Sequence, residues 1–168
     1  MTDAKLCPLS IENGHLVYRL LQRIPAYENG FYNKAHGLSF EEYKSWLRRC
    51  EEIRQGVNLK EGEVEESIYW LLVDDIPIGM GKIRHRLTPA LKIHGGNLSY
   101  SITPQQRNKG YGTILLDLLL KEAKRLQLNE VLVTIYRYNL PSHQVIIKNG
   151  GILIEETDLR AYYHFDTL

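Results

Sequence analysis

The sequence has 168 residues, of which 43% are hydrophobic and 24% charged, and its formal net charge is +1. This size and composition predict one globular domain, 1–168, and give no basic excess that favours nucleic acid or a membrane surface as a partner. Its two cysteines, Cys7 and Cys50, are too few and too far apart for a disulfide framework or a zinc site, so we expect no metal.

The amino-terminal third indicates two helices. Apolar residues at helical spacing predict the first from about Leu9 to Ile24, ending near Pro25. Ser39 and Glu42 form a capping box, which predicts that a second helix begins at about residue 40. The segment 27–33 between them is rich in tyrosine, and two interpretations stay open: a loop packed by its own aromatic residues, or a wall of a substrate site.

The middle of the chain indicates β structure. Residues 67–73 and 76–86 are predicted to form a hairpin that turns at Asp74 and Asp75. Gly79 and Gly81 interrupt the row of side chains in the second strand, and glycine within a strand often marks a bulge or the close approach of another element.

A strand, a glycine-containing loop and a helix follow. After a connection over 88–96, alternating residues predict a strand at 98–102. The loop 107–112 has the sequence Arg-Asn-Lys-Gly-Tyr-Gly, and apolar residues at helical spacing predict a helix from Thr113 to Leu128.

The carboxyl-terminal part repeats this alternation of strand and helix. The β-branched run 130–135 is typical of a strand buried on both faces. A short helix is predicted over 139–148, because Asn and Pro are helix-start signals, and the glycines at 150 and 151 end it. Two strands, 152–155 and 162–165, are expected to pair with each other.

The loop before the helix has the properties of a phosphate site. The first N–H groups of a helix lack intrahelical acceptors and lie at the positive end of its dipole. Gly110 and Gly112 allow a ligand to approach the main chain, and Arg107 and Lys109 add positive charge. The loop lacks the spacing of a P-loop and of a dinucleotide-binding turn, which makes a nucleotide kinase a remote alternative.

The pattern R-x-x-G-x-G, followed one strand later by Asn139 and Ser142, resembles the acetyl-CoA site of the GNAT superfamily of N-acetyltransferases, and within it a bacterial group of predicted acetyltransferases. The resemblance implies an α/β (α+β) fold with a mixed, mostly antiparallel sheet flanked by helices, and a splayed pair of parallel strands at the acetyl-CoA site. It implies that backbone groups of the first splayed strand, the glycine loop and the start of the short helix bind the cofactor. The implied cofactor-binding residues are Ser101, Ile102, Thr103, Arg107, Asn108, Lys109, Gly110, Tyr111, Gly112, Thr113, Asn139 and Ser142.

The side chains for acid–base catalysis do not carry over from the resembled family. The usual tyrosine position is Ile146, and the usual glutamate position falls near Gly96. Tyr100 and His85 are the first substitutes, because each can donate a proton and a histidine titrates near neutrality. Tyr136, Tyr138 and Glu28 are further candidates, and proton transfer through water without a dedicated side chain is also open.

The resemblance implies transfer of an acetyl group from acetyl-CoA to a primary amine of a small molecule, peptide or protein. The alternative is a non-catalytic acyl-CoA-binding sensor or interaction module. The expected partners are therefore an amine acceptor of unknown identity, no nucleic acid and no membrane, with pairing of terminal strands allowing a homodimer. Since no signal peptide or long apolar segment is present, we expect a cytoplasmic protein.

Overall fold

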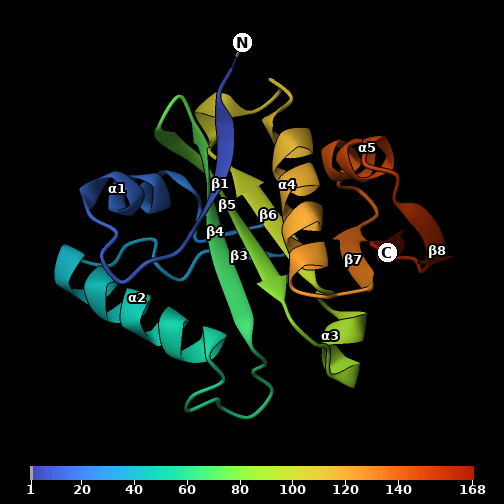
Figure 1. The fold of residues 1–168 in the computed structure, drawn as a ribbon. Helices are drawn as coiled ribbons and strands as arrows, with labels where there is room; N and C mark the ends of the chain where they lie inside the picture. Colours follow the sequence, from blue (N-terminus) through green and yellow to red (C-terminus); the bar gives the residue numbers. More distant parts are fainter. Residues whose placement is uncertain (1) are drawn as a thin grey trace.

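The computed structural model describes residues 2–168, which form a four-stranded and a three-stranded antiparallel sheet, with helices on both sides, and a separate two-stranded hairpin (Figure 1). The first sheet has the strand order β1-β4-β5-β6 and the second β7-β9-β8. This arrangement confirms the predicted class of an antiparallel sheet flanked by helices. Within the described residues, no helix is both long enough and apolar enough to cross a bilayer.

The bounds of the elements, in chain order, are as follows: β1 Ala4–Pro8, α1 His15–Arg23, β2 Tyr27–Glu28, β3 Phe31–Tyr32, α2 Phe40–Arg54, β4 Glu66–Val73, β5 Ile76–Arg84, α3 Pro89–Ile93, β6 Leu98–Ile102, the 3-10 turn Pro104–Gln106, α4 Tyr111–Arg125, β7 Glu130–Tyr136, α5 Leu140–Lys148, β8 Ile152–Glu156 and β9 Arg160–Asp166.

The amino-terminal part differs from the prediction in two places. Residues 4–8 form the edge strand β1, and helix α1 begins at His15 rather than at Leu9. The tyrosine-rich segment forms the short hairpin β2–β3. Helix α2 begins as predicted, since the Ser39 side chain accepts from the Glu42 N–H and the Glu42 carboxylate accepts from the Ser39 N–H.

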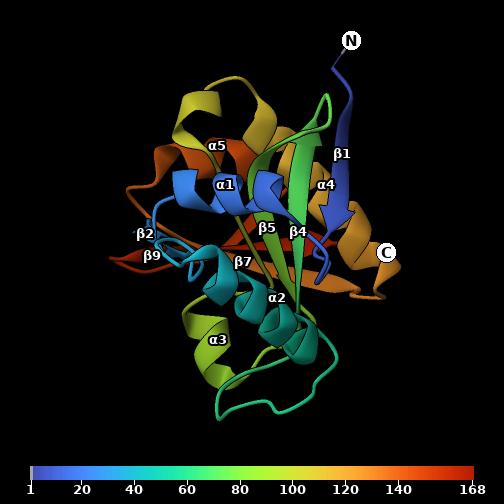
Figure 2. The ribbon, with the colours of Figure 1, turned by 90° about the vertical axis from the view of Figure 1, so that its left-hand side faces the viewer.

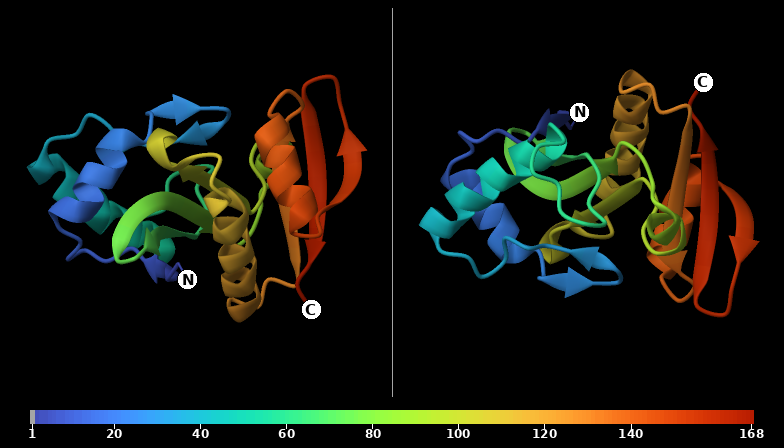
Figure 3. Two further views of the ribbon diagram at one scale, coloured as in Figure 1. Left: turned by 90° about the horizontal axis from the view of Figure 1, so that it is seen from above. Right: turned by 90° about the horizontal axis from the view of Figure 1, so that it is seen from below.

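Helices cover both faces of the first sheet. Helices α1 and α2 pack on the face that carries Trp70 and Met80, whereas α4 packs on the face that carries Leu71. Figure 3 shows α4 between the four-stranded sheet and the carboxyl-terminal part. A Cβ at Gly81 would lie 2.7 Å from Leu119 of α4, so the glycine does mark the close approach of a helix.

The predicted hairpin of β4 and β5 is confirmed. Asp74 and Asp75 both have positive φ angles, 49° and 63°, as a two-residue type I′ turn requires. Strand β7 was expected to be buried on both faces, but its burial alternates: Val131 and Val133 lie in the core, and the side chains between them are half-buried.

Strand β7 is hydrogen-bonded to the segment just before β6 and not to β6 itself. The Asn97 N–H donates to the Leu132 carbonyl at 2.7 Å, and the Leu132 N–H donates to the Asn97 side-chain oxygen at 2.9 Å. The Asn97 amide also donates to the Arg84 carbonyl at 3.1 Å. One buried asparagine therefore connects the two sheets, and beyond it β6 and β7 belong to separate ladders.

Strand β9 lies between β7 and β8, which confirms the predicted pairing of the two terminal strands and adds a second partner. Strand β8 is left as an edge, and its apolar residues Ile152, Leu153 and Ile154 are all exposed. An exposed apolar edge is a surface on which strands of two copies can pair. The homodimer stays a prediction.

Candidate active site

The connection from β6 to α4 adopts left-handed backbone conformations at two positions. Asn108 has a φ of 61° and Gly110 a φ of 84°. Gly110 is the N-cap of α4, and its carbonyl accepts the first helical hydrogen bond, from the Ile114 N–H at 3.2 Å. Glycine adopts this conformation without the steric cost that a Cβ brings, which is why the helix begins here.

The loop presents a row of N–H groups that have no acceptor. Within residues 2–168, the backbone N–H groups of 108–113 make no hydrogen bond to the protein. They lie at the positive end of the 15-residue helix α4, and Gly110 has no atom within 4 Å of where a Cβ would be. Such a set of donors in open space is suited to a bound anion, above all a phosphate.

The two cations predicted for this loop are already engaged. The Arg107 Nε donates to the Ile102 carbonyl at 3.0 Å, and its Nη2 lies 2.6 Å from the Glu28 carboxylate. Lys109 donates to the side-chain oxygen of Gln106 at 3.0 Å. Both therefore add positive charge near the loop, while the unpaired donors are those of the backbone.

Strand β6 leaves part of its backbone unpaired. The Thr103 N–H donates to the Ile78 carbonyl at 2.9 Å, so it is turned toward β5. Because the backbone groups of an antiparallel strand alternate in direction, those of Ser101 also face β5, and those of Tyr100 and Ile102 face the side of β7. Of the three residues predicted to bind through the backbone, Ile102 alone has an N–H that points away from β5.

The Tyr100 side chain is on the α4 face, and its hydroxyl is a buried polar group without a partner. Tyr100 Oη has no hydrogen bond of good geometry within residues 2–168, although the Ser142 hydroxyl is close enough to interact with it. Burial raises the pKa of Tyr100 to about 12, and the interaction with Ser142 opposes part of this rise. Buried hydroxyls in proteins are nearly always hydrogen-bonded, so an unpaired one beside the loop is a candidate for contact with a ligand.

The predicted residues of α5 lie on the same side of the molecule. Asn139 is the N-cap of α5 and Ser142 lies in its first turn, half-buried. A Cβ at Gly112 would lie 3.4 Å from Val145, and the Asn149 side chain donates to the Thr113 carbonyl at 3.1 Å, so the beginning of α4 packs against the carboxyl-terminal half of α5. Ile146 is fully buried in the core and takes no part in acid–base chemistry.

His85 is not near the loop. It follows the end of β5, and its Nε2 lies 2.7 Å from the Ser67 hydroxyl. Ile102 pairs with Gly79, six residues earlier, which separates it from His85 by roughly 20 Å along the strand. Burial lowers the pKa of His85 below its ordinary value of 6.5. The structure thus brings Tyr100 close to Ser142, one of the predicted cofactor residues, but does not bring His85 there.

The hairpin β2–β3 lies against β6 and reaches the end of β7 through the Tyr27 side chain, and Figure 2 shows it at the same level as β7. Glu28 forms the ion pair with Arg107, which follows β6, and the Tyr27 hydroxyl lies 3.3 Å from that of Tyr136, at the end of β7. Gly30 packs on the ring of Tyr136. Periodicity gave no signal for this contact, because each of the two strands has only two residues.

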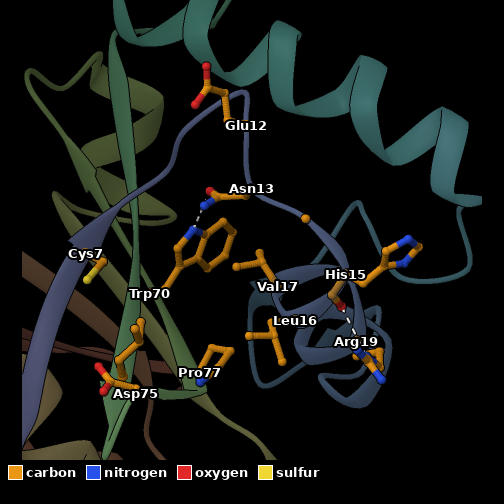
Figure 4. Close-up of a pocket in the computed structure, with 12 residues that line it drawn as sticks. Cys7, Glu12, Asn13, His15, Leu16, Val17, Arg19, Trp70, Asp75 and Pro77 are labelled. Carbon is orange, nitrogen blue, oxygen red and sulfur yellow. Dashed lines mark hydrogen bonds between the residues drawn. The ribbon is translucent and has the colours of Figure 1, made fainter.

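A cavity of about 480 Å³ lies elsewhere, between β1 and α1 (Figure 4). Its wall includes Trp70, Leu16 and Cys7, and the Trp70 indole donates to the Asn13 side-chain oxygen at 2.9 Å. None of the residues predicted for the cofactor lines this cavity. The loop and the splayed strands therefore remain the candidate active site.

Comparisons with known proteins bear on the family and the fold of the chain. A family model described as an acetyltransferase (GNAT) domain matches residues 15–152. No curated protein matches the chain. Among solved structures, the chain is similar to the Campylobacter jejuni N-acetyltransferase PseH in complex with acetyl coenzyme A, with a TM-score of 0.63 and 14% identity, covering 98% of this chain and 99% of that one.

Two further structures share this fold. The ribosomal-protein-S5-alanine acetyltransferase from Vibrio fischeri has a TM-score of 0.70 and 12% identity, covering 98% of this chain and 93% of that one. RimL, a ribosomal L7/L12 alpha-N-protein acetyltransferase in complex with coenzyme A, has a TM-score of 0.70 and 14% identity, covering 97% and 93%. At these identities the likeness is one of fold.

Proposed function

Because the chain belongs to the GNAT acetyltransferase family, we propose that it transfers the acetyl group of acetyl-CoA to a primary amine by direct attack, with both substrates bound at once. The observation that carries this proposal is the row of unpaired N–H groups at 108–113, beside an unpaired buried hydroxyl. A row of donors alone would serve any anion. The hydroxyl of Tyr100 adds a donor where a reacting group can lie.

The residues present fit acetyl-CoA. The N–H groups of 108–113 would hold its pyrophosphate, and Ser142 at the start of α5 would contact the adjoining arm. When bound, acetyl-CoA supplies a thioester whose carbonyl carbon an amine can attack. The backbone groups of β6 that face away from β5 are free to pair with the arm of acetyl-CoA.

The transfer forms a bond between the amine nitrogen and the acetyl carbon and breaks the bond between that carbon and sulfur. Negative charge develops first on the carbonyl oxygen, and the Ile102 N–H is the backbone donor that we assign to it. A fixed donor of this kind contributes on the order of 3 kcal/mol to lowering the barrier. The sulfur leaves as a thiolate, to which the Tyr100 hydroxyl donates a hydrogen bond.

The attacking amine also loses a proton. His85 is too far away to accept it, and the Glu28 carboxylate is engaged with Arg107. The usual glutamate position of the resembled family falls near Gly96, which has no side chain, and the side chain of the next residue, Asn97, is engaged in holding β7 to β5. We therefore assign proton removal to water on the side of the hairpin.

The first test is calorimetric titration with acetyl-CoA and with free CoA. Replacing Gly110 with Asp puts a negative charge among the N–H groups of the loop, and we expect micromolar binding to be lost. Gly62→Asp is the matched control, because Gly62 has nearly the same φ, 83°, and equally open space around its Cβ position. Equal affinity in the Gly110→Asp and Gly62→Asp variants would contradict the assignment of the loop.

The alternative is a module that binds acyl-CoA without turnover. It keeps the loop but needs neither the Tyr100 hydroxyl nor an amine acceptor. Release of free CoA that depends on an added amine separates the two functions. Binding without such release, across a broad panel of primary amines, would favour the sensor.

A further inference from the structure

Arg160, the first residue of β9, has most of its hydrogen-bonding capacity unused. A guanidinium has five N–H donors. The side chain of Arg160 makes one hydrogen bond, from Nη2 to the Tyr136 hydroxyl at a long 3.3 Å, and its buried Nε has no acceptor within the described chain. Its guanidinium carbon lies 4.5 Å from the centre of the Tyr136 ring.

The charge of Arg160 is not balanced by a carboxylate. Across residues 2–168, Arg160 forms no ion pair, although the neighbouring Arg137 lies 3.1 Å from the Glu156 carboxylate. A half-buried cation that lacks a counter-ion, and whose buried Nε has no acceptor, is costly for the folded protein. An anion bound to Arg160 would supply both the missing counter-ion and the missing hydrogen-bond acceptors.

Arg160 lies on the face of the second sheet opposite to α5. Tyr163 marks the α5 face, because its hydroxyl is 2.7 Å from His143 of that helix. Arg160 pairs with Tyr136 across the sheet and shares the other face with Tyr162, whose hydroxyl donates to the Ile93 carbonyl of α3. The side chain is therefore separated by the sheet from Ser142 and the other residues assigned to acetyl-CoA.

The same face is adjacent to the hairpin β2–β3. Tyr136, over which the guanidinium lies, contacts both Tyr27 and Gly30 of the hairpin. The hairpin in turn holds Arg107 through Glu28. Arg160 and Arg107 of the glycine loop are therefore both linked to the hairpin, Arg160 through Tyr136 and Arg107 through Glu28. In the proposed function, acetyl-CoA binds on the other side of the second sheet, so the face with Arg160 is open to the acceptor.

We propose that Arg160 binds an anionic group of the acceptor, a carboxylate or a phosphate, so that the substrate is an amine that also carries negative charge. The inference rests on the proposed function and deepens it. A planar guanidinium matches either anion with two parallel hydrogen bonds, and Tyr136 holds the guanidinium in place. Specificity arises because a neutral acceptor leaves the buried Nε unpaired.

The direct test is NMR of the arginine Nε–H signals of the protein saturated with CoA, titrated with inorganic phosphate and, separately, with acetate. The Arg160 signal is identified by its absence in Arg160→Gln. We expect it to shift and saturate with at least one anion, while the Arg137 signal shifts little because that side chain is already paired. No shift of the Arg160 signal with either anion would overturn the proposal.

The same spectra separate this proposal from the proposed function. CoA binding is read from the backbone amides of Gly110 and Gly112 before any anion is added. Shifts of these amides without a response at Arg160 would refute the acceptor subsite alone. A shift of the Arg160 signal without shifts of the Gly110 and Gly112 amides would refute the assignment of the cofactor loop. Arg160 would then be an anion-binding site that is independent of CoA.

The activity test uses matched amines that differ in one anionic group: phosphoethanolamine with ethanolamine, and glycine with glycinamide. We expect turnover of a charged member to exceed that of its neutral partner. In Arg160→Gln the KM for that member should rise about tenfold or more with little change in kcat, and Arg137→Gln should behave as wild type. If the effect is confined to phosphoethanolamine, the acceptor carries a phosphate; if it is confined to glycine, the acceptor carries a carboxylate. Faster turnover of the neutral members would contradict the proposal.

Discussion

Replacing Tyr100 with Phe should make the protein more stable and the enzyme slower. The hydroxyl is buried without a hydrogen bond, so removing it relieves the cost of an unsatisfied polar group, about 1–3 kcal/mol. For a chain of 168 residues this corresponds to a rise in Tm of roughly 2–4 °C for each kcal/mol. Phenylalanine keeps the aromatic ring of Tyr100, which fills the space beside α4.

The same change should lower kcat. A hydrogen bond to a charged group is worth about 1.5–3 kcal/mol, which corresponds to a loss of roughly 10- to 150-fold if the bond forms only as the thiolate leaves. The assay is CoA release at saturating acetyl-CoA, together with the affinity for acetyl-CoA from calorimetry. Affinity should change little, because the hydroxyl acts on the leaving sulfur.

Tyr69→Phe is the matched control. Tyr69 is also a buried tyrosine of the first sheet, and burial raises its pKa to about 12, but its hydroxyl donates to the Glu122 carboxylate at 3.1 Å. Because this hydrogen bond is to a charged group, the variant should lose about 1.5–3 kcal/mol of stability and keep its activity. A Tyr100→Phe variant that is less stable than wild type, or that keeps full kcat, would refute the reasoning.

Three further predictions follow from other contacts. In urea unfolding, the contribution of Tyr69 and Tyr100 to stability should be complete below about pH 10 and should be lost from pH 10 to 12, because the folded state keeps the protons that these tyrosines release in the unfolded chain; each Phe variant should reduce the decline over this range. Gly96→Ala should cost more than 3 kcal/mol, since its Cβ would lie 2.4 Å from the Leu132 carbonyl oxygen at a φ of 71°; a Tm close to that of wild type would contradict the described connection between the sheets. His85→Gln should keep kcat and KM for both substrates, and a tenfold loss of kcat without a loss of stability would show that His85 reaches the reaction after all.

The sequence predicted the elements that are long and regular. A turn at Asp74 and Asp75 predicted the hairpin of β4 and β5, and alternation predicted β6. A capping box with apolar residues predicted α2, and helical spacing predicted α4. Strand β1 was missed because its five residues show no clear alternation, and it is specified by pairing with β4. The hairpin β2–β3 was missed for a similar reason, since its position depends on contacts with Arg107 and Tyr136.

The site was predictable where its function depends on the backbone. A glycine loop before a helix has the same N–H groups whatever its side chains are, so residues 108–113 stand out from the sequence alone. The catalytic side chains were not predictable in this way. Whether Tyr100 or His85 lies near the loop depends on the register of β5 with β6, and the isolation of Arg160 depends on which carboxylates the fold brings near it.

The single asparagine between the two sheets has a consequence for local opening. The Leu132 N–H depends on the Asn97 side chain, and the Asn97 N–H depends on the Leu132 carbonyl, so breaking one contact exposes both. In native-state hydrogen exchange, these two amides should exchange at the same rate and with the same dependence on denaturant, as one cooperative unit. A ligand that contacts the amino-terminal ends of both α4 and α5 would slow their exchange although it touches neither residue.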